Sequence, residues 1–238
     1  MKRARKIISI IVLLCLLGPF YLFISGQIAV TKNWQTASHA PTQLLQSMSL
    51  DKKAVIVLMS ARAFSWRGMF STHTWISFKT KDAKHFRTYQ VLGWNAYRGK
   101  PIVDISNRVP DLLWFGNQPT IEGIVVGEQA TALIPKIQEA AKSYPYADKY
   151  RAWPGPNSNT FIQYIINQLP NSGLHMPYNA LGQSYKNKWQ WSDVSLYGLL
   201  GYTYCNHSFY ITLFGLTAGV SWKPFGVIIP GVGLVSFH

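Results

Sequence analysis

The sequence has few acidic residues, few charges of either sign and almost no cysteine. Nine Asp and Glu stand against 23 Lys and Arg, and charged residues make up 13% of the chain. The carboxylates are scattered without the pairing expected of a glycosidase, and the histidines lack the spacing of metal ligands. No glycine-rich phosphate loop follows an expected strand. We therefore expect neither a metal site nor a cofactor.

Two cysteines cannot build a disulfide framework in this chain. Cys15 lies inside an apolar N-terminal segment, and Cys205 lies alone in the distant C-terminal region. We expect no bridge between them, so the cysteines do not indicate a redox compartment.

Aromatic residues are abundant, and the net charge is strongly positive. The 9 Trp, 13 Tyr and 12 Phe exclude a disordered chain, because such chains lack the apolar surface that offsets ordering entropy. The formal net charge is +14, yet the basic residues form no long block and no nucleic-acid motif. We expect a basic surface near an anionic envelope polymer or lipid, and no nucleic-acid partner.

The N-terminal segment predicts attachment to a membrane. The first residues carry four positive charges, and the run from Ile7 to Ile24 is uncharged and almost wholly apolar. As a helix it would be roughly 27 Å long, close to the thickness of the hydrocarbon core. We predict an uncleaved anchor over 1–25, with a cleaved signal as the alternative. Positive charges stay cytoplasmic, which predicts a single-pass protein with its C-terminal part outside the cytoplasm. In a diderm bacterium this means the inner membrane, with the C-terminal part in the periplasm.

Three regions follow the anchor. Residues 26–50 are polar and predict a stalk, with a short helix around 44–48. Residues 51–190 predict an α+β core domain. Residues 191–238 predict an apolar, β-rich extension packed on that core, and from 194 onward they carry one charge, Lys223. Glycines and polar residues interrupt what could otherwise be a second membrane helix.

Hydrophobic patterns within the core predict a small, mainly antiparallel sheet with two packed helices. Strands are expected at 54–59, 72–79, 86–94 and 120–126. Apolar residues at helical spacing predict a helix over 130–144, in which Pro135 implies a kink or a late start. A second helix is expected over 160–169, before Pro170.

The segment Pro154–Phe161 is the most constrained local piece and opens the second helix. Asn157, Ser158 or Asn159 can cap that helix, and the free N–H groups at its start can stabilise an oxyanion. Ser158 could then act as a nucleophile if a base reaches it. An ordinary helix cap explains the same residues, and both interpretations stay open at this stage.

Several motifs resemble the bacterial family known as domain of unknown function 3750. The resemblance extends in order over most of residues 54–235, and its motifs lie at 73–76, 91–94, 110–116, 133–137, 144–146 and 150–161. This family has no established activity, so the resemblance implies kinship without a function.

A more distant resemblance implies a mechanism. Circularly permuted, papain-like hydrolases of the NlpC type have a His on an early strand and a later Asn-Cys-x-x-Phe element that opens a helix. Here His73 matches the early His, and Asn157-Ser158-Asn159-Thr160-Phe161 has the same frame with Ser158 in place of the cysteine. The resemblance implies Ser158 as nucleophile and His73 as base. These sites depend on a cysteine thiolate of low pKa, which serine cannot provide. The other possibility is therefore that the chain keeps the papain-like fold but has no catalytic activity.

Binding residues and a third catalytic group are less defined. Asn157 and Asn159 flank Ser158, and Arg151 and Trp153 precede the turn, where they could contact an anionic or sugar-like ligand. Candidates for a group that orients His73 lie on the following strand: Tyr89, Gln90 and Asn95.

Two functions remain. One is a catalytically silent binding or assembly protein of the cell envelope that uses a basic surface and a Trp-rich pocket. The alternative is a hydrolase or acyltransferase that acts on an amide or ester bond through Ser158 and His73.

Overall fold

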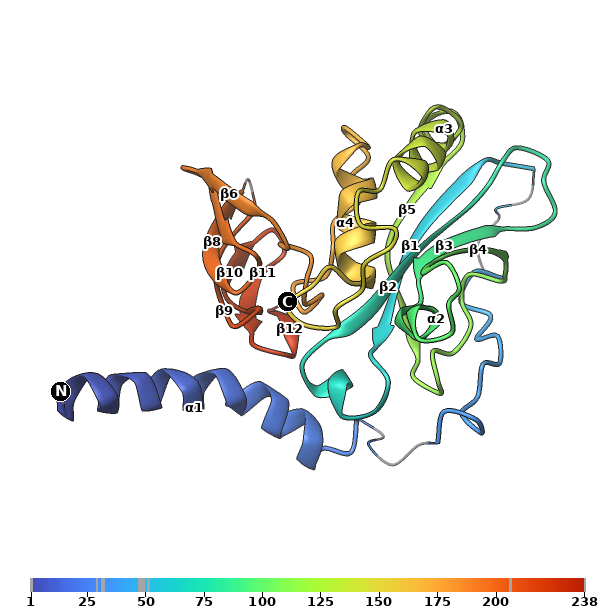
Figure 1. Cartoon of the computed structure of the whole chain (residues 1–238). Helices are drawn as coiled ribbons and strands as arrows, with labels where there is room; N and C mark the ends of the chain where they lie inside the picture. The colour runs from blue at the N-terminus through green and yellow to red at the C-terminus, as the bar shows by residue number, and fades with distance from the viewer. Residues whose placement is uncertain are drawn as a thin grey trace.

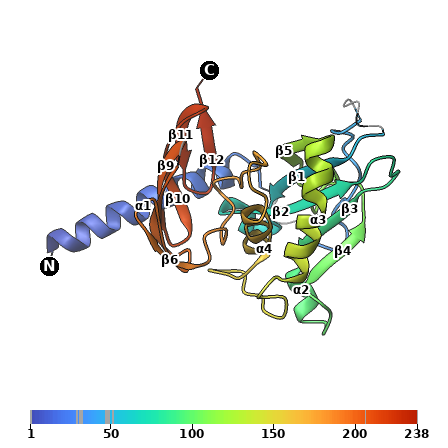
Figure 2. The same ribbon diagram turned by 90° about the horizontal axis from the view of Figure 1, so that it is seen from above.

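The computed structural model describes residues 2–28, 30, 33–46, 50, 52–205 and 207–237. Two antiparallel sheets stand side by side, and a helix lies between them (Figures 1 and 2). This arrangement, with four α-helices among the described residues, confirms the predicted α+β class.

The first sheet has five strands in the order β4-β3-β2-β1-β5, and neighbouring strands are antiparallel. The bounds are β1 Val55–Arg62, β2 Thr72–Lys79, β3 Arg87–Val91, β4 Val103–Asn107 and β5 Pro119–Val126. A 3₁₀ helix, η1 (Ser65–Met69), joins β1 to β2. The predicted third strand is shorter than expected, because its last residues enter α2 (Gly93–Ala96), and β4 was not predicted.

Two helices cover one face of this sheet. α3 (Glu128–Lys142) continues through Pro135, so the late start is not observed, and its predicted apolar face is buried. α4 (Ser158–Asn167) packs on β2 and β3. Phe161, Ile162 and Ile165 are completely buried in this core, and each such side chain contributes about 1.5–3 kcal/mol to stability.

The segment predicted as a stalk lies against the opposite face. Ala37, Leu44 and Leu45 pack on the cluster formed by the outward-facing side of β1 and β2. Backbone bonds join this segment to residues 111–116; for example, the N–H of Leu113 donates to the carbonyl of Ala40. Residues 44–46 form a turn, and residues 47 and 48 of the predicted short helix lie outside the described residues.

The N-terminal helix α1 (Lys2–Ile24) projects from the body of the molecule (Figure 1). Only its C-terminal part packs: Leu22 is buried, and Gly18 lies against Ile229, Pro230 and Val232. Of the helices in the described residues, none combines the length and apolar character that a membrane crossing requires. The predicted transmembrane span is therefore without support from the structure.

The second sheet has seven antiparallel strands in sequence order, which agrees with the predicted β-rich extension. Its strands are β6 Asn187–Gln190, β7 Asp193–Leu196, β8 Leu200–Cys205, β9 Ser208–Leu213, β10 Leu216–Trp222, β11 Phe225–Ile229 and β12 Gly233–Ser236.

This second sheet has its polar face turned inward. Ser195, Ser208, Thr212, Thr217 and Ser221 are buried on the side that faces the rest of the protein. Three of their hydroxyl groups donate to backbone carbonyls: Ser195 to Ser184, Thr217 to Tyr178 and Ser221 to His207. Alternation along each strand therefore turns the apolar residues outward.

Arg62 and Asn179 tie the two sheets together at the turn between β11 and β12. The Arg62 guanidinium donates to the carbonyls of Gly68, Gly231 and Val232, at 3.3, 2.6 and 2.9 Å. The Asn179 amide donates to the Val232 carbonyl at 3.0 Å. Both side chains donate hydrogen bonds to backbone carbonyls that have no partner in the strand ladder at this turn.

Candidate functional site

The predicted nucleophile segment forms the N-terminus of α4, with Asn157 as the cap. The Asn157 side-chain oxygen accepts from the N–H groups of Asn159 and Thr160, and the Thr160 hydroxyl accepts from the Asn157 N–H. This reciprocal capping box satisfies donors that a helix start leaves open. Ser158 is the first residue of the helix and is 8% exposed. The capping interpretation, with the neighbouring Asn as cap, therefore describes the local structure.

Asn157 and Asn159 also connect three segments of the fold. The Asn157 amide donates to the carbonyls of Ala152 and Leu181. The Asn159 amide donates to the Leu181 carbonyl at 2.8 Å and to the Thr72 carbonyl at 2.9 Å. Both predicted binding residues thus use their hydrogen-bonding groups inside the protein.

Gly182 lies directly over the Asn157 side chain and has a φ of +94°. A Cβ at this position would overlap the Asn157 amide, and the positive φ is unfavourable for other residues. The close approach lets the Gly182 carbonyl accept from the Thr160 hydroxyl at 2.7 Å. The N-terminus of α4 is therefore covered by residues 181–182.

Trp153 and Arg151 lie at the surface. The Trp153 indole N–H donates to the carbonyl of Phe214, in the turn between β9 and β10, at 2.9 Å, although half of the side chain is exposed. The Arg151 side chain is exposed, and its backbone N–H donates to the Pro156 carbonyl. Trp153 thus joins the turn before α4 to the second sheet.

His73 is buried on β2 in an aromatic cluster. Its ring stacks on Trp114 with centroids 3.8 Å apart and lies 5.8 Å from the ring of Trp75. Burial lowers the pKa of His73 to about 4, and its hydrogen bond with Gln90 opposes this effect in part. The imidazole is therefore neutral at pH 7.

The hydrogen-bond partner of His73 fixes the tautomer of its ring. His73 Nε2 lies 3.1 Å from Gln90 Oε1, and Gln90 Nε2 donates to Asp104 Oδ2 at 3.0 Å. An amide oxygen only accepts, so this arrangement requires the proton on Nε2. Of the three candidates for an orienting group, Gln90 is the one that contacts His73.

Ser158 and His73 lie on opposite sides of the first sheet. Successive side chains of a strand point to opposite faces. Thr74, next to His73, points toward α4, because its hydroxyl donates to Asn159 Oδ1 at 2.9 Å. His73 points the other way and stacks on Trp114. The structure therefore does not bring the predicted nucleophile and base together, and their catalytic pairing stays a prediction that this geometry does not favour.

A cavity of about 760 Å³ lies between the two sheets. Residues of β1 and β5 line one side, the inner face of β8 and β9 lines the other, and residues 174–179 also contribute to the lining. Half of the residues that line it carry a hydroxyl, amide or imidazole group, and these include Thr120, Gln163, His175, Gln183, Thr203, His207 and Tyr210. Glu122 adds a carboxyl group and Cys205 a thiol.

Burial shifts the pKa values of several titratable side chains that line this cavity. Burial raises the pKa of Glu122, whose carboxylate accepts from the Ser60 hydroxyl. Burial also raises the pKa of Tyr210 to about 12, so its hydroxyl stays protonated. The pKa of His175 is lowered by burial and by the neighbouring His207, whose ring centroid lies 4.8 Å away. Tyr210 thus presents a neutral hydroxyl to the cavity.

Cys205 and His207 form a pair that the sequence analysis missed. They flank the hairpin turn between β8 and β9, and Cys205 Sγ lies 3.7 Å from His207 Nε2. The Ser208 hydroxyl is 3.1 Å from the same sulfur. A Cys and a His two residues apart in an expected hairpin were the available signal. Within the described residues, no group of three His, Cys, Asp or Glu side chains is arranged to hold a metal ion.

Comparison with known proteins identifies the family of this chain. No curated protein and no solved structure matched it, so the resemblance to papain-like hydrolases stays a prediction. The profile of the family described as "protein of unknown function (DUF3750)" matches residues 53–185, which include the first sheet, α3, α4 and the capped turn. Since this match covers more than half of the sequence, the chain belongs to the domain of unknown function 3750 family.

Proposed function

We propose that this protein is a non-catalytic binding protein of the bacterial cell envelope. It would be held at the periplasmic side of the inner membrane by α1 and would bind a hydroxyl-rich segment of an envelope component between its two sheets. The observation that carries the proposal is the lining of the cavity, where hydroxyl, amide and imidazole groups converge from both sheets. A few converging polar groups in a concave site are typical of ligand binding.

The chemistry of the lining favours a ligand with many hydroxyl or amide groups. Tyr210 and Thr203 present neutral hydroxyls, and Gln163 and Gln183 present amides that both donate and accept. Tyr178 adds an aromatic side chain, and its ring packs against that of Tyr210 at 5.5 Å. Lys223 lies at the same cavity and suits an anionic substituent on such a ligand.

Binding is tested by titrating the purified chain with a tetramer of N-acetylglucosamine, a probe rich in both groups. Tyr210→Phe removes one cavity hydroxyl and should weaken binding about tenfold, as expected for one lost hydrogen bond of about 1.4 kcal/mol. Tyr97→Phe is the matched control, because Tyr97 lies outside the cavity lining and is 89% exposed. Equal affinity of the two variants, or no binding by the wild type, would refute the proposed ligand class.

The Cys205–His207 pair favours a second candidate, acyl transfer in the same cavity. His207 would accept the thiol proton, and the thiolate would attack an ester carbonyl. The alcohol would leave with that proton, and water would then hydrolyse the thioester to release the acid and restore the thiol. This alternative replaces Ser158 and His73 with residues that lie within 3.7 Å of each other.

A chromogenic ester distinguishes the two candidates. If acyl transfer occurs, the wild type releases the alcohol, Cys205→Ala does not, and an acyl adduct on Cys205 is detected by mass spectrometry. Ser208→Ala, next to the sulfur, controls for disturbance of the hairpin. Equal rates in the wild type and Cys205→Ala eliminate this candidate and leave the binding role.

A further inference from the structure

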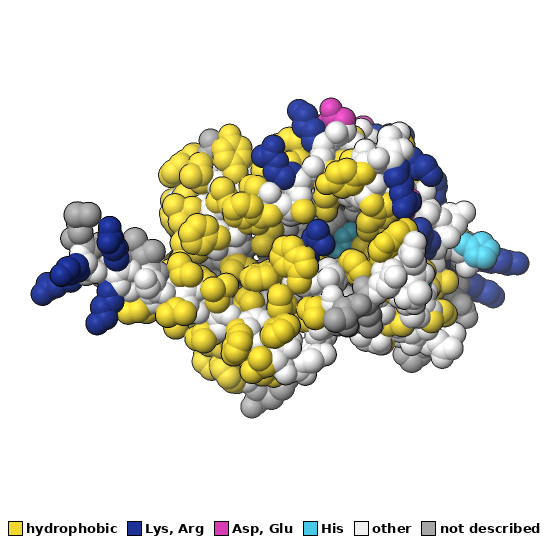
Figure 3. Space-filling model, turned by 60° about the horizontal axis from the view of Figure 1, so that its bottom comes forward, with side chains coloured by type: hydrophobic (Ala, Val, Ile, Leu, Met, Phe, Trp, Pro, Cys, Tyr) yellow, Lys and Arg dark blue, Asp and Glu magenta, His cyan; other side chains and the backbone are white. Residues whose placement is uncertain are grey.

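The outer face of the second sheet is apolar over its whole width. Strand alternation and register place Tyr204, Phe209, Ile211, Val220, Phe225 and Val235 on this face. Each of these six side chains is 38–65% exposed. The space-filling view shows hydrophobic side chains gathered over this part of the molecule (Figure 3). Among the described residues of the seven strands, the outward positions carry no charged side chain.

Such a surface is unusual for a protein surrounded by water. Antiparallel sheets with one solvated face normally place polar residues outside and apolar residues inside. Here the order is reversed, because the buried face holds Ser and Thr hydroxyls that bond to backbone carbonyls. Contiguous apolar surfaces of this kind mark contacts with a membrane or a protein partner.

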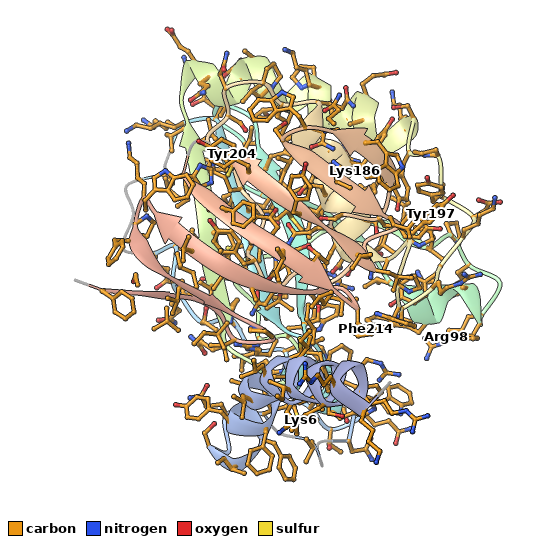
Figure 4. The ribbon with its side chains drawn as sticks, turned by 90° about the vertical axis from the view of Figure 1, so that its left-hand side faces the viewer. Lys6, Arg98, Lys186, Tyr197, Tyr204 and Phe214 are labelled. Carbon is orange, nitrogen blue, oxygen red and sulfur yellow. The ribbon has the colours of Figure 1, made fainter. Side chains whose placement is uncertain are left out.

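The helix α1 extends on the same side of the molecule. It leaves the body beside the turn between β11 and β12 and runs outward past the sheet (Figure 1). Viewed toward the outer face, it lies below the strands with Lys6 near its free end (Figure 4). Its apolar side chains are exposed, including Leu13, Leu17 and Phe20 at 63, 58 and 60%. The helix and the sheet therefore present apolar surfaces toward one region of space.

A lipid bilayer fits this region better than a second copy of the chain. A flat contact between two sheets would be obstructed by α1, which projects beyond the face (Figure 1). Lipids can surround a projecting helix and still contact the sheet beside it. Tyr side chains such as Tyr197 and Tyr204, which are 46 and 48% exposed, suit the membrane interface (Figure 4).

We propose that the outer face of the second sheet rests on the bilayer into which α1 inserts. Phe209, Ile211 and Phe225 would contact the headgroup and acyl boundary, and the cavity between the sheets would lie just above the membrane surface. This inference rests on the membrane attachment proposed above and adds a second, independent lipid contact to it.

The test compares two isoleucines in full-length protein reconstituted into vesicles of neutral and anionic phospholipid. Ile211 on β9 is 42% exposed, and Ile105 on β4 of the other sheet is 45% exposed. Each is replaced by cysteine in a Cys15→Ser, Cys205→Ser background and labelled with an environment-sensitive fluorophore. We expect nitroxide-labelled lipids to quench the Ile211→Cys probe about threefold more than the Ile105→Cys probe, as for groups buried at the interface.

The outcomes separate the two proposals. If the protein floats with the vesicles but both probes are quenched equally, the sheet does not rest on lipid, although the attachment survives. If the protein does not float with the vesicles, the attachment itself fails, and the sheet contact fails with it. If the unlabelled Ile211→Cys protein forms disulfide-linked dimers and the labelled protein escapes lipid quenching, a second copy covers the face, which also overturns the inference. Near-UV circular dichroism verifies that both variants fold.

Discussion

Burial of His73 should make the stability of the protein depend on pH. The folded-state pKa is about 4 against 6.5 for a solvated histidine, mainly because the ring is buried beside Trp114. As pH falls through 6.5, the unfolded chain binds a proton at His73 while the folded chain does not. The stability contributed by this site is therefore complete above pH 6.5 and is lost as pH falls toward 4.

The magnitude follows from the two pKa values. They differ by roughly 2.5, and each pKa unit corresponds to about 1.4 kcal/mol, so the full effect is about 3 kcal/mol. His73→Phe keeps a ring beside Trp114 but removes the titrating group. The variant is expected to be less stable at pH 7.5, because Gln90 loses its partner, and to show a smaller decrease between pH 7.5 and 4.5.

Urea denaturation followed by near-UV circular dichroism at several pH values measures this difference. Ile76→Val, on the same strand and fully buried, controls for general destabilisation, because it should lower stability by about 0.5–1.5 kcal/mol and keep the wild-type pH dependence. The reasoning is refuted if His73→Phe and the wild type lose the same stability between pH 7.5 and 4.5.

Three further substitutions test structural roles. Arg62→Met removes the guanidinium bonds to three backbone carbonyls, of which that of Val232 keeps the Asn179 amide, and should lower the unfolding free energy by about 2–4 kcal/mol in thermal denaturation; an unchanged melting temperature would contradict its role between the sheets. Gly18→Val places a side chain against the Pro230 carbonyl and should speed amide exchange at the β11–β12 turn, whereas the exposed Ser9→Val should not. Asn159→Ala should cost about 2–4 kcal/mol, whereas Ser158→Ala should leave stability within about 1 kcal/mol and ligand affinity unchanged; a loss of function in Ser158→Ala alone would restore that serine as a catalytic candidate.

Local patterns were sufficient to predict the elements of the core. The alternation in 72–79 and the helical spacing from Ala130 to Tyr144 correspond to β2 and α3, because both elements bury one face against the same core. The short strand β4 and the helix α2 were missed, since elements of five and four residues carry too little periodicity.

Contacts between distant segments could not be predicted in the same way. Strand alternation separates His73 from Thr74, but it does not say which face α4 will cover, and this choice keeps Ser158 away from His73. The cavity joins Glu122 of β5 to Cys205 of β8, and no local signal relates these two strands. Similarly, the polar composition of residues 33–46 did not reveal that they cover the first sheet.

The second sheet, with its polar face inside and its apolar face outside, also determines which of its positions can change during evolution. If lipid is its neighbour, outward residues such as Ile211 and Val220 face a fluid that imposes no fixed shape, so exchange among apolar side chains should be tolerated and the arrival of a charge should not. Inward hydroxyls such as Thr217 have a single carbonyl partner each and little room for change. Among relatives, we expect the outward apolar positions of this sheet to vary and its inward polar positions to stay the same. In an ordinary soluble protein, the buried apolar positions are the ones that vary least.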